Sequence, residues 1–356
     1  TRDRVQQTSV DPGLEGPPQT DVQPVITDNR IVVNGLLGIG VEFGDHKLRW
    51  TNLYIRDTLK QARLGLGKDQ NVQLRDTLVQ DTAWYERQLI NTQLVGEFRF
   101  DRLKVDLRGG YANSQREAPY ERSFTYVRSN LPLAQDPVGN KFVNDLGGNR
   151  GGANIAFSDL NEDLWSGGID LSYELAPRIS ATVGYAYSDT HRVAVRRAFQ
   201  IRGSNLPIAV QQLRPDYLLS DATIQLYDIT LIESSAQDGT AAFDADLVTH
   251  AGYAQIQAEL FSGVNINAGV RYEDGRQSVA IDRPIETFTS ISTDSVANSS
   301  FANAPKATLY GGEVEVQKYF ALDKMSDAAF WQSRRLVLIG NYTFTQSEIK
   351  VGAGDT

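Results

Sequence analysis

The chain has 356 residues, 41% hydrophobic and 22% charged, which is the composition of a folded protein and not of a disordered one. Its formal net charge of -9, without a basic cluster, argues against nucleic acid as a partner, and the lack of cysteine excludes disulfides and thiolate-bound metals. No apolar run approaches the roughly 18 residues of a transmembrane helix.

The first part of the chain is rich in proline. Pro12, Pro17, Pro18 and Pro24 lie there among glycine and aspartate residues. Because proline fixes φ and has no N–H to donate, we expect residues 1–30 to be a loop or an extended lead-in. The opening letters TRDRVQQTSV lack the apolar stretch of a signal peptide.

Segments that alternate apolar and polar residues follow in pairs from residue 31 onward. A period of two predicts β-strands, and two such strands joined by a short turn predict a hairpin. We expect about ten strands in five hairpins. The pairs are residues 31–44 and 47–58, 87–100 and 101–113, 164–175 and 178–190, 249–260 and 264–274, and 308–320 and 334–349.

Each predicted strand has one apolar and one polar face. Val264, Ile266 and Val270, for example, alternate with Asn265 and Arg271. In a soluble protein the apolar row would face a core, whereas in an outer-membrane barrel it would face lipid and the polar row a wet interior. Aromatic residues at the ends of the apolar rows fit the girdles of such a barrel. They are Tyr111, Tyr185, Tyr187, Tyr272, Tyr342 and Phe344 near the loop ends, and Phe100 near a turn.

Short and long connections alternate along the chain. The turns within hairpins are short, whereas the hairpins are joined by residues 58–86, 114–162, 190–248 and 275–306. Compact soluble domains rarely carry several loops beyond about 12–15 residues, but outer-membrane barrels have short periplasmic turns and long extracellular loops. The pattern therefore predicts an all-β, antiparallel transmembrane β-barrel in the cell outer membrane, in contact with lipid and lipopolysaccharide.

Several stretches resemble the barrel of TonB-dependent receptors of the Gram-negative outer membrane. They are RWTNLYIRDTLKQARLG, ERQLINTQLVGEF, ANSQREAPYE, NAGVRYED and KATLYGGEVEVQKYF. The resemblance implies a plugged barrel of about 22 strands that takes up a scarce solute such as a siderophore, vitamin or oligosaccharide. It also implies a TonB-type periplasmic energy-coupling protein, which would engage a segment absent from this sequence.

The chain departs from that family in three places. No plug-like segment or coupling box precedes residue 31, and the final letters SEIKVGAGDT do not end a closing strand on an aromatic residue. The stretch VRYEDGRQSV is followed almost at once by DRPIE, which in the family comes much later. We therefore expect residues 31–356 to be a partial barrel domain of a longer receptor, with a segment missing near residues 279–282.

Arginine and aromatic residues are concentrated in two of the predicted outer loops. Planar guanidinium groups pair with carboxylates and stack on rings, so these residues are candidates for contact with a small or medium solute. The candidate ligand-binding residues are Arg116, Tyr120, Arg122, Tyr126, Arg196, Arg197 and Arg202.

Two other functions stay open. One is a surface-exposed β-rich binding protein, with a core beneath the apolar rows. The other is a small outer-membrane barrel protease, which would use carboxylates and a histidine at its rim, where His191 and His250 lie near Asp189, Asp244 and Asp246. Because no GxSxG, HExxH or CxxC motif occurs, we expect no enzyme activity and no catalytic, cofactor-binding or metal-binding residue.

Overall fold

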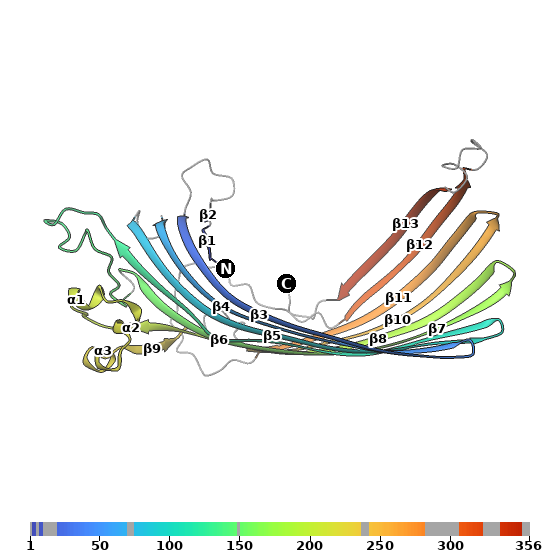
Figure 1. Cartoon of the computed structure of the whole chain (residues 1–356), viewed down its shortest axis with the longest axis horizontal. Coiled ribbons are helices and arrows are strands. Elements are labelled where there is room, and N and C mark those ends of the chain that lie inside the picture. The colour runs from blue at the N-terminus through green and yellow to red at the C-terminus, as the bar shows by residue number, and fades with distance from the viewer. Residues whose placement is uncertain are drawn as a thin grey trace.

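The computed structural model describes residues 2–4, 7–9, 20–69, 75–147, 150–235, 242–281, 306–322 and 335–350. Over these residues the protein is all-β, and its strands form one strongly curved antiparallel sheet (Figure 1). No helix in these ranges is long and apolar enough to cross a bilayer.

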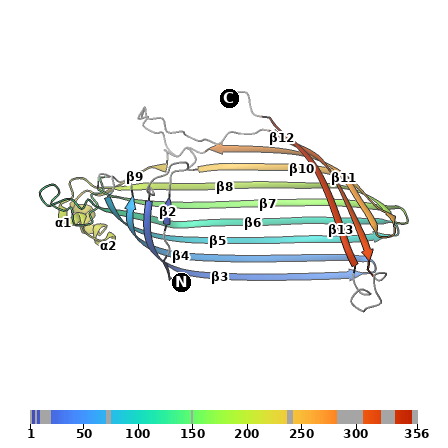
Figure 2. The same cartoon turned by 90° about the horizontal axis from the view of Figure 1, so that it is seen from above.

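The long strands lie side by side in the order of the sequence, as a meander (Figure 2). They are β3 (Thr20–Phe43), β4 (His46–Asp69), β5 (Arg75–Phe100), β6 (Leu103–Arg128), β7 (Gly152–Ala176), β8 (Ile179–Arg202), β10 (Ala242–Phe261), β11 (Val264–Ile281), β12 (Lys306–Ala321) and β13 (Arg335–Lys350). Three short strands complete the sheet: β1 (Arg2–Arg4) and β2 (Gln7–Ser9) pair with β3, and β9 (Thr230–Glu233) pairs with β8. Residues 20–30, expected in the lead-in, thus form the first part of β3.

The five predicted hairpins are confirmed, and the turns of the first four lie together at one end of the sheet (Figure 1). These four turns are tight, and each contains a residue in the left-handed region, as a two-residue hairpin turn requires. These residues are Gly44, Asp101, Arg178 and Gly263, with φ of 60°, 52°, 76° and 77°. The sheet is open, because among the described residues no ladder joins β3 to β13.

The strands extend much further than the alternation predicts. β4 and β5 pair as far as Asp69 and Arg75, so their connection is confined to residues 70–74, whereas the sequence predicts residues 58–86. The predicted loop bounds are too wide because both faces are polar there, which removes the period-two signal. Cross-strand pairs such as Arg63 with Asp81, 2.7 Å apart, lie along the continued ladder.

The main buried cluster lies at the end of the sheet opposite the tight turns. The connection from β8 to β10 carries three short helices there, α1 (Ile208–Gln211), α2 (Pro215–Leu218) and α3 (Asp221–Leu226) (Figure 1). The connection packs its apolar side chains against the strand ends. The buried residues are Phe124, Tyr126, Leu146, Ala153, Ile201, Leu206, Leu218 and Ile229.

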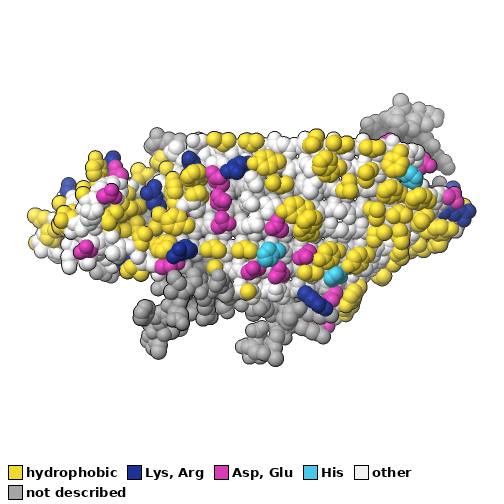
Figure 3. All heavy atoms as spheres, turned by 90° about the horizontal axis from the view of Figure 1, so that it is seen from below, with side chains coloured by type: hydrophobic (Ala, Val, Ile, Leu, Met, Phe, Trp, Pro, Cys, Tyr) yellow, Lys and Arg dark blue, Asp and Glu magenta, His cyan; other side chains and the backbone are white. Residues whose placement is uncertain are grey.

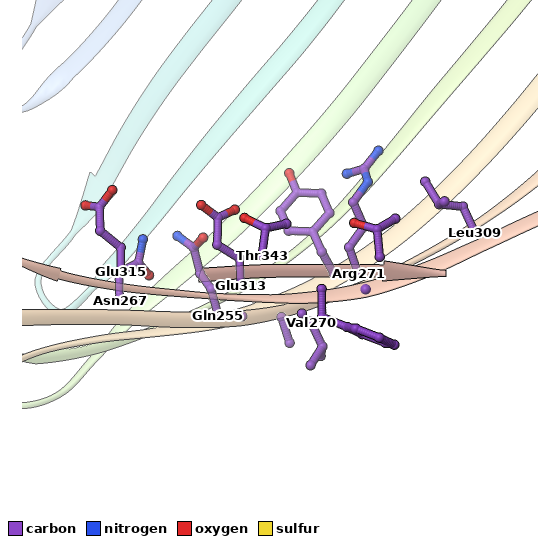
Figure 4. Close-up of a pocket in the computed structure, with 15 residues that line it drawn as sticks. Gln255, Asn267, Val270, Arg271, Leu309, Glu313, Glu315 and Thr343 are labelled. Atoms are coloured by element: carbon purple, nitrogen blue, oxygen red, sulfur yellow. The ribbon is translucent and has the colours of Figure 1, made fainter. Parts of the chain in front are cut away.

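Elsewhere the sheet is a single layer with two solvent-accessible faces. The chain exposes 23727 Å², whereas a compact soluble protein of its mass would expose about 14,000 Å². In Figure 4, Arg271 and Asn267 point into the hollow of the sheet and Val270 points away from it. Tyr253 lies opposite both Arg271 and Gly184 in the ladder, so the even-numbered residues of β8 also share the concave face.

The convex face carries a continuous band of exposed apolar side chains, which we call the apolar belt (Figure 3). It begins at the tight turns and spans about nine to eleven residues of each strand, as a crossing of bilayer hydrocarbon requires. At the edge of the belt away from the tight turns, the last residue of each row is aromatic, as predicted, and the next residue on the same face, two positions further along the strand, is polar. The aromatic residue and the polar residue after it are Tyr111 and Asn113 in β6, Trp165 and Asp163 in β7, Tyr187 and Asp189 in β8, and Tyr272 and Asp274 in β11.

Candidate ligand-binding face

Charged and hydrogen-bonding side chains gather around Glu121 on the concave face, beyond the level of the apolar belt. Glu121 accepts a hydrogen bond of 2.6 Å from the Tyr85 hydroxyl and pairs with Arg196. A guanidinium nitrogen of Arg116 lies 3.7 Å from the same carboxylate. Arg116 also donates to Ser158 Oγ at 3.2 Å, and its guanidinium lies 5.2 Å from the centre of the Tyr85 ring. Four neighbouring strands thus meet at one carboxylate.

A β-bulge in β6 brings Arg116 and Glu121 onto one face. Residues five apart in a regular strand point to opposite faces. The register of β6 shifts by one residue between Ala118 and Glu121, against β5 and against β7. Pro119 lies within this shift and has no N–H to give to the ladder, which accounts for the bulge. The stretch REAPYE therefore builds the cluster.

The charges of this cluster are fixed at neutral pH. Partial burial raises the pKa of Glu121, but hydrogen bonds from Tyr85 and Arg196 and the nearby guanidinium charges outweigh burial, and the net pKa is lowered. Burial and then the hydrogen bond to Glu121 raise the pKa of the Tyr85 hydroxyl. Tyr85 is therefore a neutral donor facing an ionised acceptor.

The positive charge extends along the same face toward β3. Arg87 lies directly opposite Arg116 in the ladder, and its guanidinium is 3.5 Å from Asp57. Arg30 holds Asp57 by two hydrogen bonds of 2.8 Å each, and these lower the pKa of Asp57. Four guanidinium groups therefore share two carboxylates. We call Arg30, Arg87, Arg116 and Arg196 the arginine cluster; its unshared N–H groups can take a carboxylate or phosphate.

Of the predicted ligand-binding residues, the structure brings only Arg116 and Arg196 together. Tyr120 and Arg122 lie on the other side of the bulge from Arg116 and stack on each other, with the guanidinium 4.9 Å from the ring centre. Arg202 donates to its near neighbour Gln200.

Two more of the predicted residues serve the connection from β8 to β10. Arg197 holds Glu233 of β9 by two hydrogen bonds of 3.0 and 2.9 Å. Tyr126 is buried in the cluster at the strand ends and donates to a main-chain carbonyl at 2.7 Å. Burial raises the pKa of its hydroxyl. Ligand contact by any of the seven residues stays a prediction.

The sequence reading missed Tyr85, Arg87, Glu121 and the pair of Arg30 with Asp57. Arg30, Tyr85 and Glu121 fall where we expected a lead-in or a loop, whereas Asp57 and Arg87 lie at the ends of predicted strands, next to such a loop. One signal was available: a proline inside a strand demands a bulge, and a bulge reverses which residues share a face.

A second polar surface lies between β10 and β13 on the concave face (Figure 4). It is a hollow of about 330 Å³, at the small end of the range for ligand pockets. Glu313 and Glu315 line it, together with Gln255, Asn267 and Thr343. The concave face is thus arginine-rich near β5 and β6 and acidic near β12.

The histidines of the protease alternative lie outside both of these surfaces. His191 Nδ1 is 2.8 Å from Asp246 and 3.5 Å from Asp244. His250 instead hydrogen-bonds the Tyr185 hydroxyl at 2.7 Å, and its ring lies 5.1 Å from the ring of Tyr187. The two histidines therefore do not share a site, and only His191 joins carboxylates.

Comparisons with known proteins find a distant likeness among solved structures. No family model matches the sequence, and no curated protein matches it. Among solved structures, the chain is similar to the crystal structure of the siderophore receptor PiuA from Acinetobacter baumannii, with a TM-score of 0.33 and 10% sequence identity. The match covers 85% of this chain and 48% of that one, so this chain spans about half the length of that receptor.

Proposed function

We propose that the chain is the barrel part of a TonB-dependent outer-membrane receptor that takes up a scarce solute. The apolar belt carries this proposal. A band of apolar side chains that runs across every long strand would be costly in water, since exposed apolar patches on soluble monomers rarely exceed a few hundred Å². Bilayer hydrocarbon in contact with the belt removes this cost. Within the sheet, the backbone N–H and C=O groups hydrogen-bond to neighbouring strands, which lipid could not provide.

Tryptophan positions give a direct test of this orientation. Trp50 and Trp165 belong to the belt and are 43% and 59% exposed, whereas Trp84 lies further along its strand. At about 3.4 Å per residue and a tilt of about 40°, they lie roughly 10, 28 and 42 Å from the level of the turns. Only the first depth falls inside a belt about 25 Å tall, and the second falls at its edge.

We would therefore prepare the full chain in lipid vesicles as three variants with one tryptophan each. The other tryptophans become phenylalanine, including Trp331, which lies outside the described residues. Lipids brominated on the acyl chain should quench Trp50 strongly, Trp165 less and Trp84 least. Equal quenching of Trp50 and Trp84, or no quenching, contradicts the membrane assignment and favours the water-soluble binding protein.

For the solute, we infer that the arginine cluster contacts an anionic group. Its guanidinium surplus lies on the wet face, where carboxylate or chelate oxygens can accept bidentate hydrogen bonds. Arg116→Ala with Arg196→Ala should weaken binding of an anionic ferric hydroxycarboxylate chelate by at least tenfold. The matched control is Arg197→Ala, next in sequence but on the opposite face and paired with Glu233. Equal losses in both variants contradict the assignment.

The proposal that uptake is driven by energy from the inner membrane rests only on the sequence resemblance to TonB-dependent receptors. A TonB-type periplasmic protein would act on a plug within the barrel, and the strands described here would serve as its rigid frame. Uptake of a labelled chelate by cells with and without an inner-membrane proton gradient measures this dependence. Uptake that survives loss of the gradient contradicts the coupling and leaves the membrane assignment intact.

A further inference from the structure

His191 of β8 and two aspartates of β10 meet on the convex face, just beyond the apolar belt. His191 lies directly opposite Asp246 in the ladder, and Asp244 is two positions along β10, so it points to the same side. Their ligand atoms all lie within 4.8 Å of one another. His191 is 53 positions from Asp244 and 55 from Asp246 in sequence, so it is the strand register that brings the three residues together.

The distances within this group match the edges of a metal coordination shell. His191 Nδ1 is 2.8 Å from Asp246 Oδ1 and 3.5 Å from Asp244 Oδ1. Metal bonds of about 2.0–2.2 Å to imidazole nitrogen and carboxylate oxygen give ligand separations of about 2.8–3.1 Å in an octahedron and about 3.3–3.6 Å in a tetrahedron. One ion could therefore bond His191 Nδ1 and either carboxylate oxygen, and all three ligand atoms lie within 4.8 Å of one another.

The local charge favours a cation. Within the described ranges, His191 is the only ion-pair partner of Asp244 and of Asp246. Asp163 lies opposite His191 on its other side and adds a third carboxylate. The Ser278 hydroxyl donates to Oδ2 of Asp246 at 3.4 Å, which leaves Oδ1 turned toward the histidine. A singly charged imidazolium neutralises this group only in part, whereas a divalent ion supplies one more positive charge.

We propose that His191, Asp244 and Asp246 bind a divalent transition-metal ion such as Zn²⁺ at the seam of β8 and β10. One nitrogen and two carboxylate oxygens are ligands that zinc accepts, and water would complete the shell. The ion replaces the proton on Nδ1, which is released. The β8–β10 ladder continues only as far as Val195 and Ala242, so the ion would tie the two strands four pairs before the end of their ladder.

Calorimetric titration of the intact, detergent-solubilised chain with Zn²⁺ tests the proposal. The wild type should bind one ion per chain with saturation, and His191→Gln and Asp244→Asn should each weaken binding at least tenfold. The control is His250→Gln, an exposed histidine of β10 on the same face whose ring hydrogen-bonds the Tyr185 hydroxyl, and this variant should bind as the wild type does. Heat-dependent gel mobility would show that each variant keeps the folded sheet.

Titration with Co²⁺ supplies a second readout that does not depend on heat signals. A site of one imidazole and two carboxylates gives visible absorption bands that differ from those of hydrated Co²⁺, and these should be lost in His191→Gln. The proposal is overturned if the wild type shows no saturable binding, if His250→Gln loses as much as His191→Gln, or if the Co²⁺ spectrum stays that of the hydrated ion.

Discussion

Val270→Arg probes which solvent meets the convex face. Val270 is 65% exposed and points away from the hollow of the sheet. It lies six residues from the start of β11, about 20 Å along the strand and about 15 Å in depth at a tilt of about 40°. In a belt about 25 Å tall this is close to the midplane, where arginine costs about 2–3 kcal/mol. The ratio of folded to unfolded protein in lipid should therefore fall about 30- to 140-fold at equilibrium.

Urea titration of the full chain in short-chain lecithin vesicles measures this cost, with folded protein counted by its heat-dependent gel mobility. Asn267→Arg is the matched control, because it puts the same side chain on the same strand but on the concave face, beside Glu313 and Glu315 (Figure 4). It should leave the midpoint almost unchanged. If the two variants shift the midpoint equally, hydrocarbon does not cover the Val270 row, and the membrane reasoning fails.

Three further perturbations test the packing of the sheet. Gly184→Ala should lower the thermal midpoint at a cost of about 1–3 kcal/mol, because the new Cβ would lie 2.2 Å from the Tyr253 ring; an unchanged midpoint would contradict the contact. Tyr126→Phe removes the hydrogen bond to the carbonyl of the half-buried Leu213 and should cost about 0.5–1.5 kcal/mol, seen as faster proteolysis within residues 203–235. Hydrogen bonds from Arg197 lower the pKa of Glu233 from its ordinary 4.5, so this stabilisation is present above pH 4.5 and lost as pH falls through the folded pKa. Hydrogen exchange of β9 should rise over that window, and Glu233→Gln should remove the pH dependence.

The sequence predicts the part of the fold that lies in the apolar belt. In residues 264–274 and 178–190 a strict period of two exists because one face meets an apolar medium and the other a polar one, and the structure confirms both strands and their faces. The sequence also predicts the tight turns, because the alternation of apolar and polar residues is interrupted for only a few residues at each turn. The apolar rows therefore predict which segments are strands, and short turns predict which of them are neighbours in the sheet.

The same reasoning fails where both faces meet water. Residues 59–69 and 75–86 form a regular ladder, but charged residues occupy both sides, so no period distinguishes strand from loop. The candidate ligand-binding face lies in this zone. Arg116 and Arg196 could be predicted as ligand-binding candidates because arginine suits anionic ligands. Their contact with the same carboxylate, Glu121, depends on a one-residue bulge in β6 that the composition does not reveal. The pairing of His191 with Asp246 likewise requires the register of β8 and β10.

The height of the strands has a consequence for the path of an arriving molecule. β5 has 26 residues, about 88 Å along the strand and about 68 Å in height at a tilt of about 40°, of which the bilayer takes about 25 Å. Arg116 is thirteen residues from its turn, only about 10 Å outside the hydrocarbon by the same measure. A molecule that arrives at the outer ends of the strands would still descend roughly 30 Å along the concave face before meeting these guanidinium groups, so first contact and final docking would be separate events in space and time.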